Sequence, residues 1–132
     1  MINIGLQKRV DVFSENQGHN PALGTFLEEH GLDFRGIVLD GRKLAGAVIP
    51  GSDFSGMDLH DVDFAGANLG GADFSGAELR DVDFTKANLD NANFTGATII
   101  RGSRFRATCY DARMDGLTFS GTNLERVWPD LT

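Results

Sequence analysis

The sequence predicts an all-β solenoid in which short strands wind into a four-sided β-helix. Three observations predict it: large apolar residues recur every five positions, glycine recurs at a fixed place in the same five, and the chemistry repeats best at every twentieth residue. With 132 residues, of which 41% are hydrophobic, the chain is long enough for one domain with a buried core.

The period of five extends from Phe34 to Leu124, where seventeen of nineteen positions hold a large apolar residue. An amphipathic helix cannot keep one face over this length at a period of five, and simple strand alternation does not skip the same positions. A small or apolar residue also lies two places before most of these positions. We therefore expect two inward side chains to flank one outward side chain, followed by a corner where glycine tolerates positive φ.

The period of twenty indicates four such units in each coil. Phe34, Phe54, Phe74, Phe94 and Met114 follow one another at this interval, and each has a glycine two places later. Nineteen units make about 4.75 coils, and a strand spacing of about 4.8 Å predicts a rod roughly 23 Å long. We assign residues 32–126 to this β-helix.

The pattern breaks near Arg104 and Cys109, the two positions without a large apolar residue. An unpaired arginine is costly in a dry core. One interpretation is a local bulge that turns Phe105 and Tyr110 inward and Arg104 outward, with the frame restored at Met114. The alternative is that Arg104 lies at an exposed, splayed corner.

Residues 1–31 lack the period of five and are predicted to form an N-terminal cap. Ile2, Ile4 and Leu6 alternate with polar residues or glycine, which predicts a short strand. Asn20 followed by a proline is typical of a helix start, and Gly31 of a helix end, so a short helix is expected over 21–30.

Residues 127–132 form the C-terminal segment. Trp128 and Leu131 are expected either to fold over the last coil or to contact a second molecule, since tryptophan is common in interface centres. The oligomeric state consistent with this is a monomer or a homodimer formed through one end of the β-helix.

Several copies of the unit share the form Ala-(Asp/Asn)-(Leu/Phe): Ala67-Asn68-Leu69, Ala72-Asp73-Phe74, Ala87-Asn88-Leu89 and Ala92-Asn93-Phe94. In this motif the chain resembles the pentapeptide-repeat proteins over about 32–126. The resemblance implies a right-handed quadrilateral β-helix with four pentapeptides in each coil. It also implies a protein-binding module that is not an enzyme.

The negative charge is concentrated in the middle of the chain. Residues 52–91 hold nine acids against Arg80 and Lys86, and the net charge of the whole chain is −7. This balance argues against direct binding of nucleic acid. We name eight of these acids the acidic ladder, the candidate partner-binding residues: Asp53, Asp58, Asp61, Asp63, Asp73, Glu78, Asp81 and Asp83.

Two functional hypotheses follow from the ladder. The best-characterised relatives imitate DNA and bind DNA gyrase, so the resemblance implies a DNA mimic whose acidic surface occupies the DNA-binding surface of a gyrase-like topoisomerase or of another DNA-binding protein. Those relatives are longer and dimerise through a C-terminal helix, which nothing after Leu124 predicts here. The alternative is a scaffolding solenoid, or a delivered effector, whose acidity belongs only to the repeat motif.

No catalytic or metal-binding constellation is visible in the sequence. His19, His30 and His60 are scattered, and Cys109 falls on a core position without an evident base beside it. We therefore expect no enzymatic activity and no cofactor. A single cysteine indicates a reducing compartment, and no apolar run reaches the roughly 18 residues of a membrane span. A bacterial, cytoplasmic protein without membrane contact is the expectation.

Overall fold

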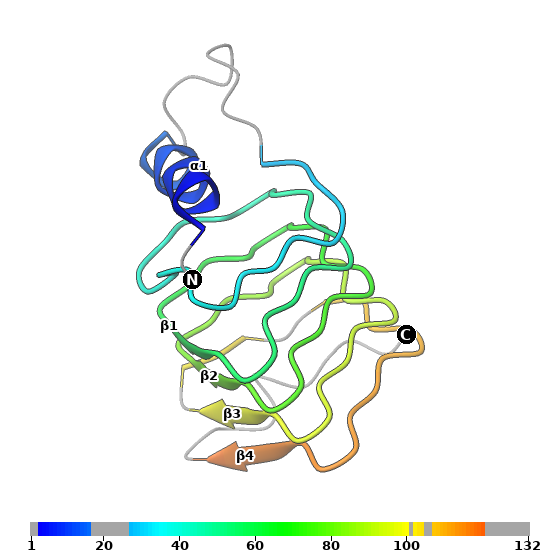
Figure 1. The fold of residues 1–132 in the computed structure, drawn as a ribbon. Coiled ribbons are helices and arrows are strands. Elements are labelled where there is room, and N and C mark those ends of the chain that lie inside the picture. The colour runs from blue at the N-terminus through cyan, green and yellow to red at the C-terminus, as the bar shows by residue number, and fades with distance from the viewer. Residues whose placement is uncertain (1–2, 17–26, 101, 105–106, 121–132) are drawn as a thin grey trace.

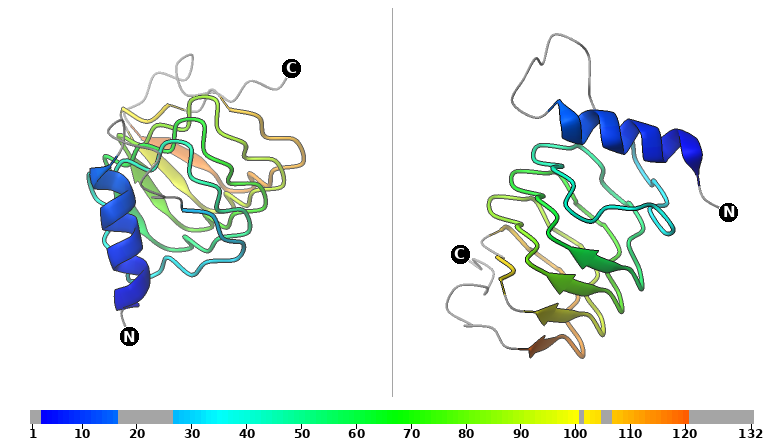
Figure 2. Two further views of the ribbon diagram at one scale, coloured as in Figure 1. Left: turned by 90° about the horizontal axis from the view of Figure 1, so that it is seen from above. Right: turned by 90° about the vertical axis from the view of Figure 1, so that its left-hand side faces the viewer.

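The computed structural model describes residues 3–16, 27–100, 102–104 and 107–120. Within these ranges lie one helix, α1 (Ile4–Glu15), and after it four strands: β1 (Asp58–His60), β2 (Glu78–Arg80), β3 (Thr98–Ile100) and β4 (Thr118–Ser120). The strands pair in parallel in the order β1-β2-β3-β4 and form one side of a stack of coils (Figure 1). Helix α1 lies across one end of that stack (Figure 2).

Each coil is twenty residues long, as the sequence predicts. Leu59 is in register with Leu79, and Leu79 with Ile99. Single bridges on the other sides keep the same interval, for example Asp53 with Asp73. We number the sides by their buried columns. Side 1 holds Phe34, Phe54, Phe74 and Phe94; side 2 holds Leu39, Leu59, Leu79 and Ile99; side 3 holds Leu44, Phe64 and Phe84; side 4 holds Ile49, Leu69, Leu89 and Cys109.

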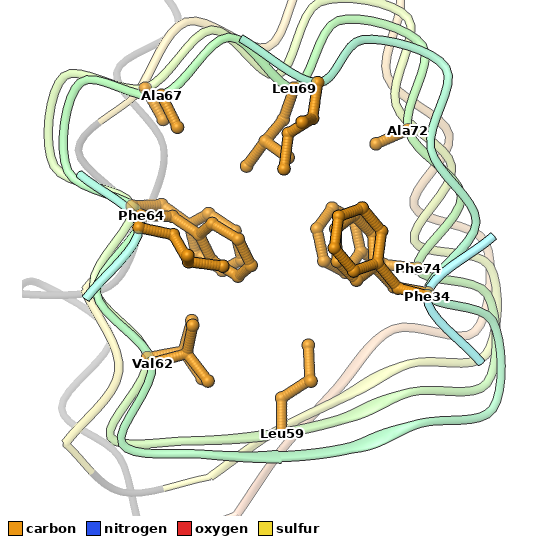
Figure 3. Close-up of a cluster of buried hydrophobic side chains, with 14 of the residues drawn as sticks. Phe34, Leu59, Val62, Phe64, Ala67, Leu69, Ala72 and Phe74 are labelled. Carbon is orange, nitrogen blue, oxygen red and sulfur yellow. The ribbon is translucent and has the colours of Figure 1, made fainter. Parts of the chain in front are cut away.

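The core contains these columns, which point toward the axis, together with the smaller residues two places before them, such as Val62 and Ala67. The phenylalanines of sides 1 and 3 face each other (Figure 3). On side 1 the rings of Phe54 and Phe74 stack with centroids 4.7 Å apart and planes 3° from parallel. Across the axis, Phe74 and Phe84 meet edge to face at 5.4 Å. Both arrangements are favoured by the quadrupole of the aromatic ring.

The corners adopt the left-handed conformation that the glycine pattern predicts. Gly76, for example, has φ +67, and a Cβ there would meet nothing within 4 Å. Non-glycine residues also occupy such corners, including Asp61 at φ 57 and Asp81 at φ 52. Aspartate tolerates this region better than most side chains do.

The register break is a one-residue insertion that is corrected within the same coil. Ile100 pairs with Arg80, but Arg104 pairs with Asp83, so one extra residue lies between them. Thr108 then pairs with Asn88, which restores the interval of twenty.

Arg104 is exposed, as both interpretations expect, and the one-residue insertion is what favours the bulge. The inward placement of Tyr110 is wrong: its side chain is 57% exposed, and the neighbouring Cys109 fills the core position. Phe105, the other residue expected to turn inward, lies outside the described residues. The buried residue brought inward by the insertion is Ser103.

The N-terminal cap differs from the prediction. The expected strand is wrong at Ile4 and Leu6, because residues 4–15 form α1; Ile2 lies outside the described residues. Asn3 caps the helix by accepting a hydrogen bond from the Leu6 N–H at 2.9 Å. Leu6, Val10 and Phe13 share one helical face and are buried against the first coil. This period of 3.6 outweighs the short alternation because it buries three large side chains.

The predicted helix over 21–30 is also wrong where it can be seen. Residues 27–29 are not helical, Glu28 pairs in parallel with Val48, and His30 lies in a turn. Residues 21–26 lie outside the described residues. Gly31 is a coil corner with φ +73 and not a helix end. The β-helix therefore begins by Leu27, ahead of the predicted boundary at residue 32.

Candidate protein-binding surface

The acidic ladder is divided among three sides of the β-helix. Asp53 and Asp73 lie on side 1, and Asp63 and Asp83 on the opposite side 3. Asp58 and Glu78 are the first residues of β1 and β2 on side 2, where they lie in register. Asp61 and Asp81 occupy the corner between sides 2 and 3. A single flat partner therefore cannot contact all eight residues.

Four members of the ladder, Asp53, Asp63, Asp73 and Asp83, are half-buried and have a structural role. The Oδ1 atom of each accepts the backbone N–H two residues later, at 2.8–2.9 Å. Asn68, Asn88 and Asn93 make the same bond at equivalent places in other units. This turn needs a side-chain oxygen and not a charge.

Cations accompany the acids on sides 1 and 3. On side 1, Nε of Arg35 lies 3.0 Å from Oδ1 of Asp33 and 3.3 Å from Oδ2 of Asp53. The side-chain hydrogen bond from Arg35 holds the pKa of Asp33 below its usual value, and the same bond raises the pKa of Arg35.

On side 3, single bridges connect Lys43 to Asp63, Asp63 to Asp83, and Asp83 to Arg104. The two acids of this column therefore lie between two cations. Neighbouring strands are about 4.8 Å apart, so opposite charges at successive positions attract one another.

The other four ladder residues are exposed: Asp58, Asp61, Glu78 and Asp81. No hydrogen bond or ion pair with another described residue engages their carboxylates. His60 and Arg80 are the basic side chains within β1 and β2. We name these four acids the side-2 carboxylates, because they lie on side 2 or at its corner.

Asp40 is a further exposed acid of side 2 that does not belong to the acidic ladder. It stands twenty residues before His60, so the register alone would place it on the same side. Asp40 precedes the segment 52–91, in which the negative charge is concentrated, so only the charge of each side reveals it.

Trp128 and Leu131, the expected end-cap or dimer contacts, lie outside the described residues. So does His19. His30 and His60 are both exposed, whereas Cys109 is buried. Within the described ranges, no three histidine, cysteine or acidic side chains are grouped as a metal site would require. No helix in the same ranges has the length and apolar character needed to cross a membrane.

Comparison with known proteins supports the fold. The family pattern described as pentapeptide repeats matches residues 39–76 and 58–96. Among solved structures, a pentapeptide repeat protein from the thylakoid lumen of Arabidopsis thaliana is 33% identical, with a TM-score of 0.52; the match covers 75% of this chain and 61% of that one. No curated protein sequence matches significantly.

Two further solved structures are more distant. QnrB1, a plasmid-mediated fluoroquinolone resistance protein, is 22% identical over 76% of this chain and 56% of its own, with a TM-score of 0.44. HetL, a pentapeptide repeat protein involved in heterocyst differentiation regulation in the cyanobacterium Nostoc, is 22% identical over 74% and 54%, with a TM-score of 0.33. The chain spans less than two thirds of the length of each of these three structures. The β-helix is right-handed, as expected for this fold.

Proposed function

We propose, from the premise that this chain is a member of the pentapeptide-repeat family, that it is a non-enzymatic module that binds a protein partner through side 2 of its β-helix. The observation that carries the proposal is the different use of two sets of acids. Asp53, Asp63, Asp73 and Asp83 hold corners together, whereas the side-2 carboxylates are exposed and have no such bond to a described residue.

The side-2 carboxylates carry an electrostatic cost that the fold does not require. Asp58 lies in register with Glu78 on the neighbouring strand, and like charges directly opposite each other in a sheet are mildly destabilising. Strand residues of this kind tolerate neutral side chains, as Thr98 shows at the next place in the same column. A partner with a basic surface would turn this repulsion into attraction.

The partner that fits best is a protein whose basic surface normally binds DNA. Regularly spaced carboxylates along a narrow rod present negative charge as a row of phosphates does, and such binding is steered electrostatically and weakened by salt. A gyrase-like topoisomerase is one candidate, and another DNA-binding protein with a shorter groove is the second. A rod of roughly 23 Å covers only about seven base pairs at 3.4 Å each.

A scaffolding solenoid is the second candidate function, and one observation favours it. Half of the acidic ladder is explained by corner formation alone, since asparagine performs the same task elsewhere in the chain. In that case the acidity is a property of the repeat. The partner would then bind through another side or through an end of the rod.

Two matched variants distinguish the candidates. The first neutralises the side-2 carboxylates: Asp58→Asn, Asp61→Asn, Glu78→Gln and Asp81→Asn. Asparagine is suited to the positive φ of positions 61 and 81. The second replaces Asp53, Asp63, Asp73 and Asp83 by asparagine, which keeps the turn bonds. Each variant removes four negative charges and changes the net charge from −7 to −3.

The measurement is binding to purified DNA gyrase and to lysate proteins captured at low and high salt, with partners identified by mass spectrometry. A mimic that uses side 2 predicts salt-sensitive capture of a DNA-binding protein, lost in the first variant and kept in the second. Equal loss in both variants would mean that net charge alone attracts the partner. Capture that neither salt nor either variant changes would favour the scaffold.

A further inference from the structure

Among the residues that the structure describes, no earlier coil pairs with the edge of the first coil on sides 2 and 3, at Val38 and Lys43. In the lower coils, the residue at the same place uses both backbone groups to bond to the coil before it. The Asp53 N–H donates to the Leu32 carbonyl at 2.8 Å, and the Asp53 carbonyl accepts from the Phe34 N–H at 2.9 Å. Val38 and Lys43 have no described coil before them, so their groups need other partners.

Helix α1 supplies those partners with side chains. The Val38 N–H donates to Oε1 of Gln7 at 2.7 Å, and the Val38 carbonyl accepts from Nε2 of Gln7 at 3.0 Å. The side-chain amide of Gln7 thus replaces both bonds that a preceding strand would make. The Lys43 N–H donates to the Ser14 hydroxyl at 2.8 Å in the same way.

The attachment of α1 to this edge is limited. Three apolar side chains, Leu6, Val10 and Phe13, are buried against the core. The remaining contacts are polar and partly exposed, such as the pair between Asp11 and Arg42 at 2.9 Å. Local elements with few buried contacts open more readily than the core does.

We propose that α1 is a displaceable stopper, and that its release lets this edge pair with the same edge of a second copy of the chain. The edge is self-complementary because Val38 presents both a donor and an acceptor along the axis. A two-fold axis reverses the strand direction, so the two copies would pair antiparallel, end to end, with a single closed interface.

The test introduces two buried charges into α1 of the full chain, Leu6→Asp with Val10→Asp. The matched control places two aspartates on the outer face of the same helix, Ile4→Asp with Val12→Asp, at side chains that are 68% and 46% exposed. Molar mass is measured by light scattering over a range of concentrations, and the exchange of the Val38 and Lys43 amides by NMR or mass spectrometry. The first variant is expected to double from 14.3 kDa to about twice that mass, and the control to stay monomeric.

A third variant adds Val38→Pro to the first. Proline removes the N–H that α1 covers, and this N–H bonds to Gln7 and not to another coil. We expect the added proline to restore the monomer; Val38→Pro alone, checked by circular dichroism, controls for folding. Three results would overturn the proposal. The variant with Leu6→Asp and Val10→Asp could stay monomeric, either with both amides exchanging rapidly or with both amides still protected, in which case α1 does not cover them. The third is a dimer that persists when Val38→Pro is added.

Discussion

The ring of Phe74 stacks on the ring of Phe54 with centroids 4.7 Å apart, and the ring of Phe94 lies on its other side at 5.0 Å. Phe74 also meets Phe64 and Phe84 edge to face across the axis. It is fully buried. One side chain thus connects three successive coils on side 1 with side 3, and this is how a solenoid transmits stability between neighbouring units.

Phe74→Ala should therefore cost about 3–5 kcal/mol of unfolding free energy, because it leaves a cavity between two stacked rings. Phe34→Ala is the matched control, since Phe34 stacks on Phe54 at the end of the same column. We expect a smaller loss there. Urea unfolding of both variants measures the difference, and a loss below about 1 kcal/mol for Phe74→Ala would contradict the packing described here.

Replacing two buried serines by alanine should change the free energy of unfolding in opposite directions. The Ser52 hydroxyl is buried without a partner among the described residues, in a column that elsewhere holds Ala72 and Ala92. The Ser103 hydroxyl accepts from the Val82 N–H at 3.1 Å and donates to the Leu79 carbonyl at 2.9 Å.

Ser52→Ala should leave stability unchanged or raise it by about 1 kcal/mol, because an unsatisfied buried hydroxyl is removed. Ser103→Ala should lower stability by about 1–3 kcal/mol, because a buried N–H loses its acceptor. Thermal and urea unfolding of both variants measures the contrast. Equal effects of the two substitutions would contradict these assignments.

The coil architecture could be predicted from the sequence because it depends on short-range repetition. In each five-residue unit the sequence itself marks the corner and the inward positions. The register of Leu59 with Leu79 can therefore be predicted by counting four units along the chain. The N-terminal end of the β-helix could not be predicted in this way, because α1 covers an edge that exists only after the coils have formed. The sequence pattern that indicates α1 consists of only three apolar residues at helical spacing, Leu6, Val10 and Phe13. It competes with the alternation of apolar and polar residues at the start of the chain.

The candidate surface could be predicted only in part, for a related reason. The sequence locates the acids but not what their oxygens do. Asp73 and Glu78 look equivalent in a charge count, yet Asp73 accepts the Ser75 N–H at 2.8 Å while Glu78 is exposed on β2. The two carboxylates differ in role because of the turn geometry, which cannot be predicted from the composition of a segment.

Gly102→Ala should be more destabilising than Gly76→Ala. Both glycines have positive φ, +93 and +67, so each substitution costs about 1–2 kcal/mol in backbone strain. At Gly76 a Cβ has open space, whereas at Gly102 it would overlap the carboxylate of Asp81, whose Cγ lies 2.8 Å away.

The added cost at Gly102 should disappear if Asp81 is first replaced by glycine, which also suits the positive φ of that corner. A double-mutant cycle measured by urea unfolding tests this coupling. Additive effects of Gly102→Ala and Asp81→Gly would show that the two residues do not constrain each other.

The contact between α1 and the first coil should weaken in acid. The hydrogen bond from Arg42 is the largest influence on the pKa of Asp11 and lowers it; burial acts in the opposite direction, and a bond from Gln7 adds to the lowering. The unfolded chain has an aspartate pKa of about 3.9. Because the folded value is lower, the stabilisation is fully present above pH of about 4 and is lost as the pH falls through the folded pKa.

The effect is small, because both side chains are about one-third exposed and solvent screens the pair. Exposed pairs of this kind contribute less than about 1 kcal/mol. The measurement is the difference in unfolding free energy between the natural chain and Asp11→Asn from pH 7 down to 2.5. This difference should be constant near neutral pH and shrink toward zero in acid. Arg42→Gln should remove the same pH-dependent part, and a difference that is independent of pH in either comparison would show that this pair does not hold α1 in place.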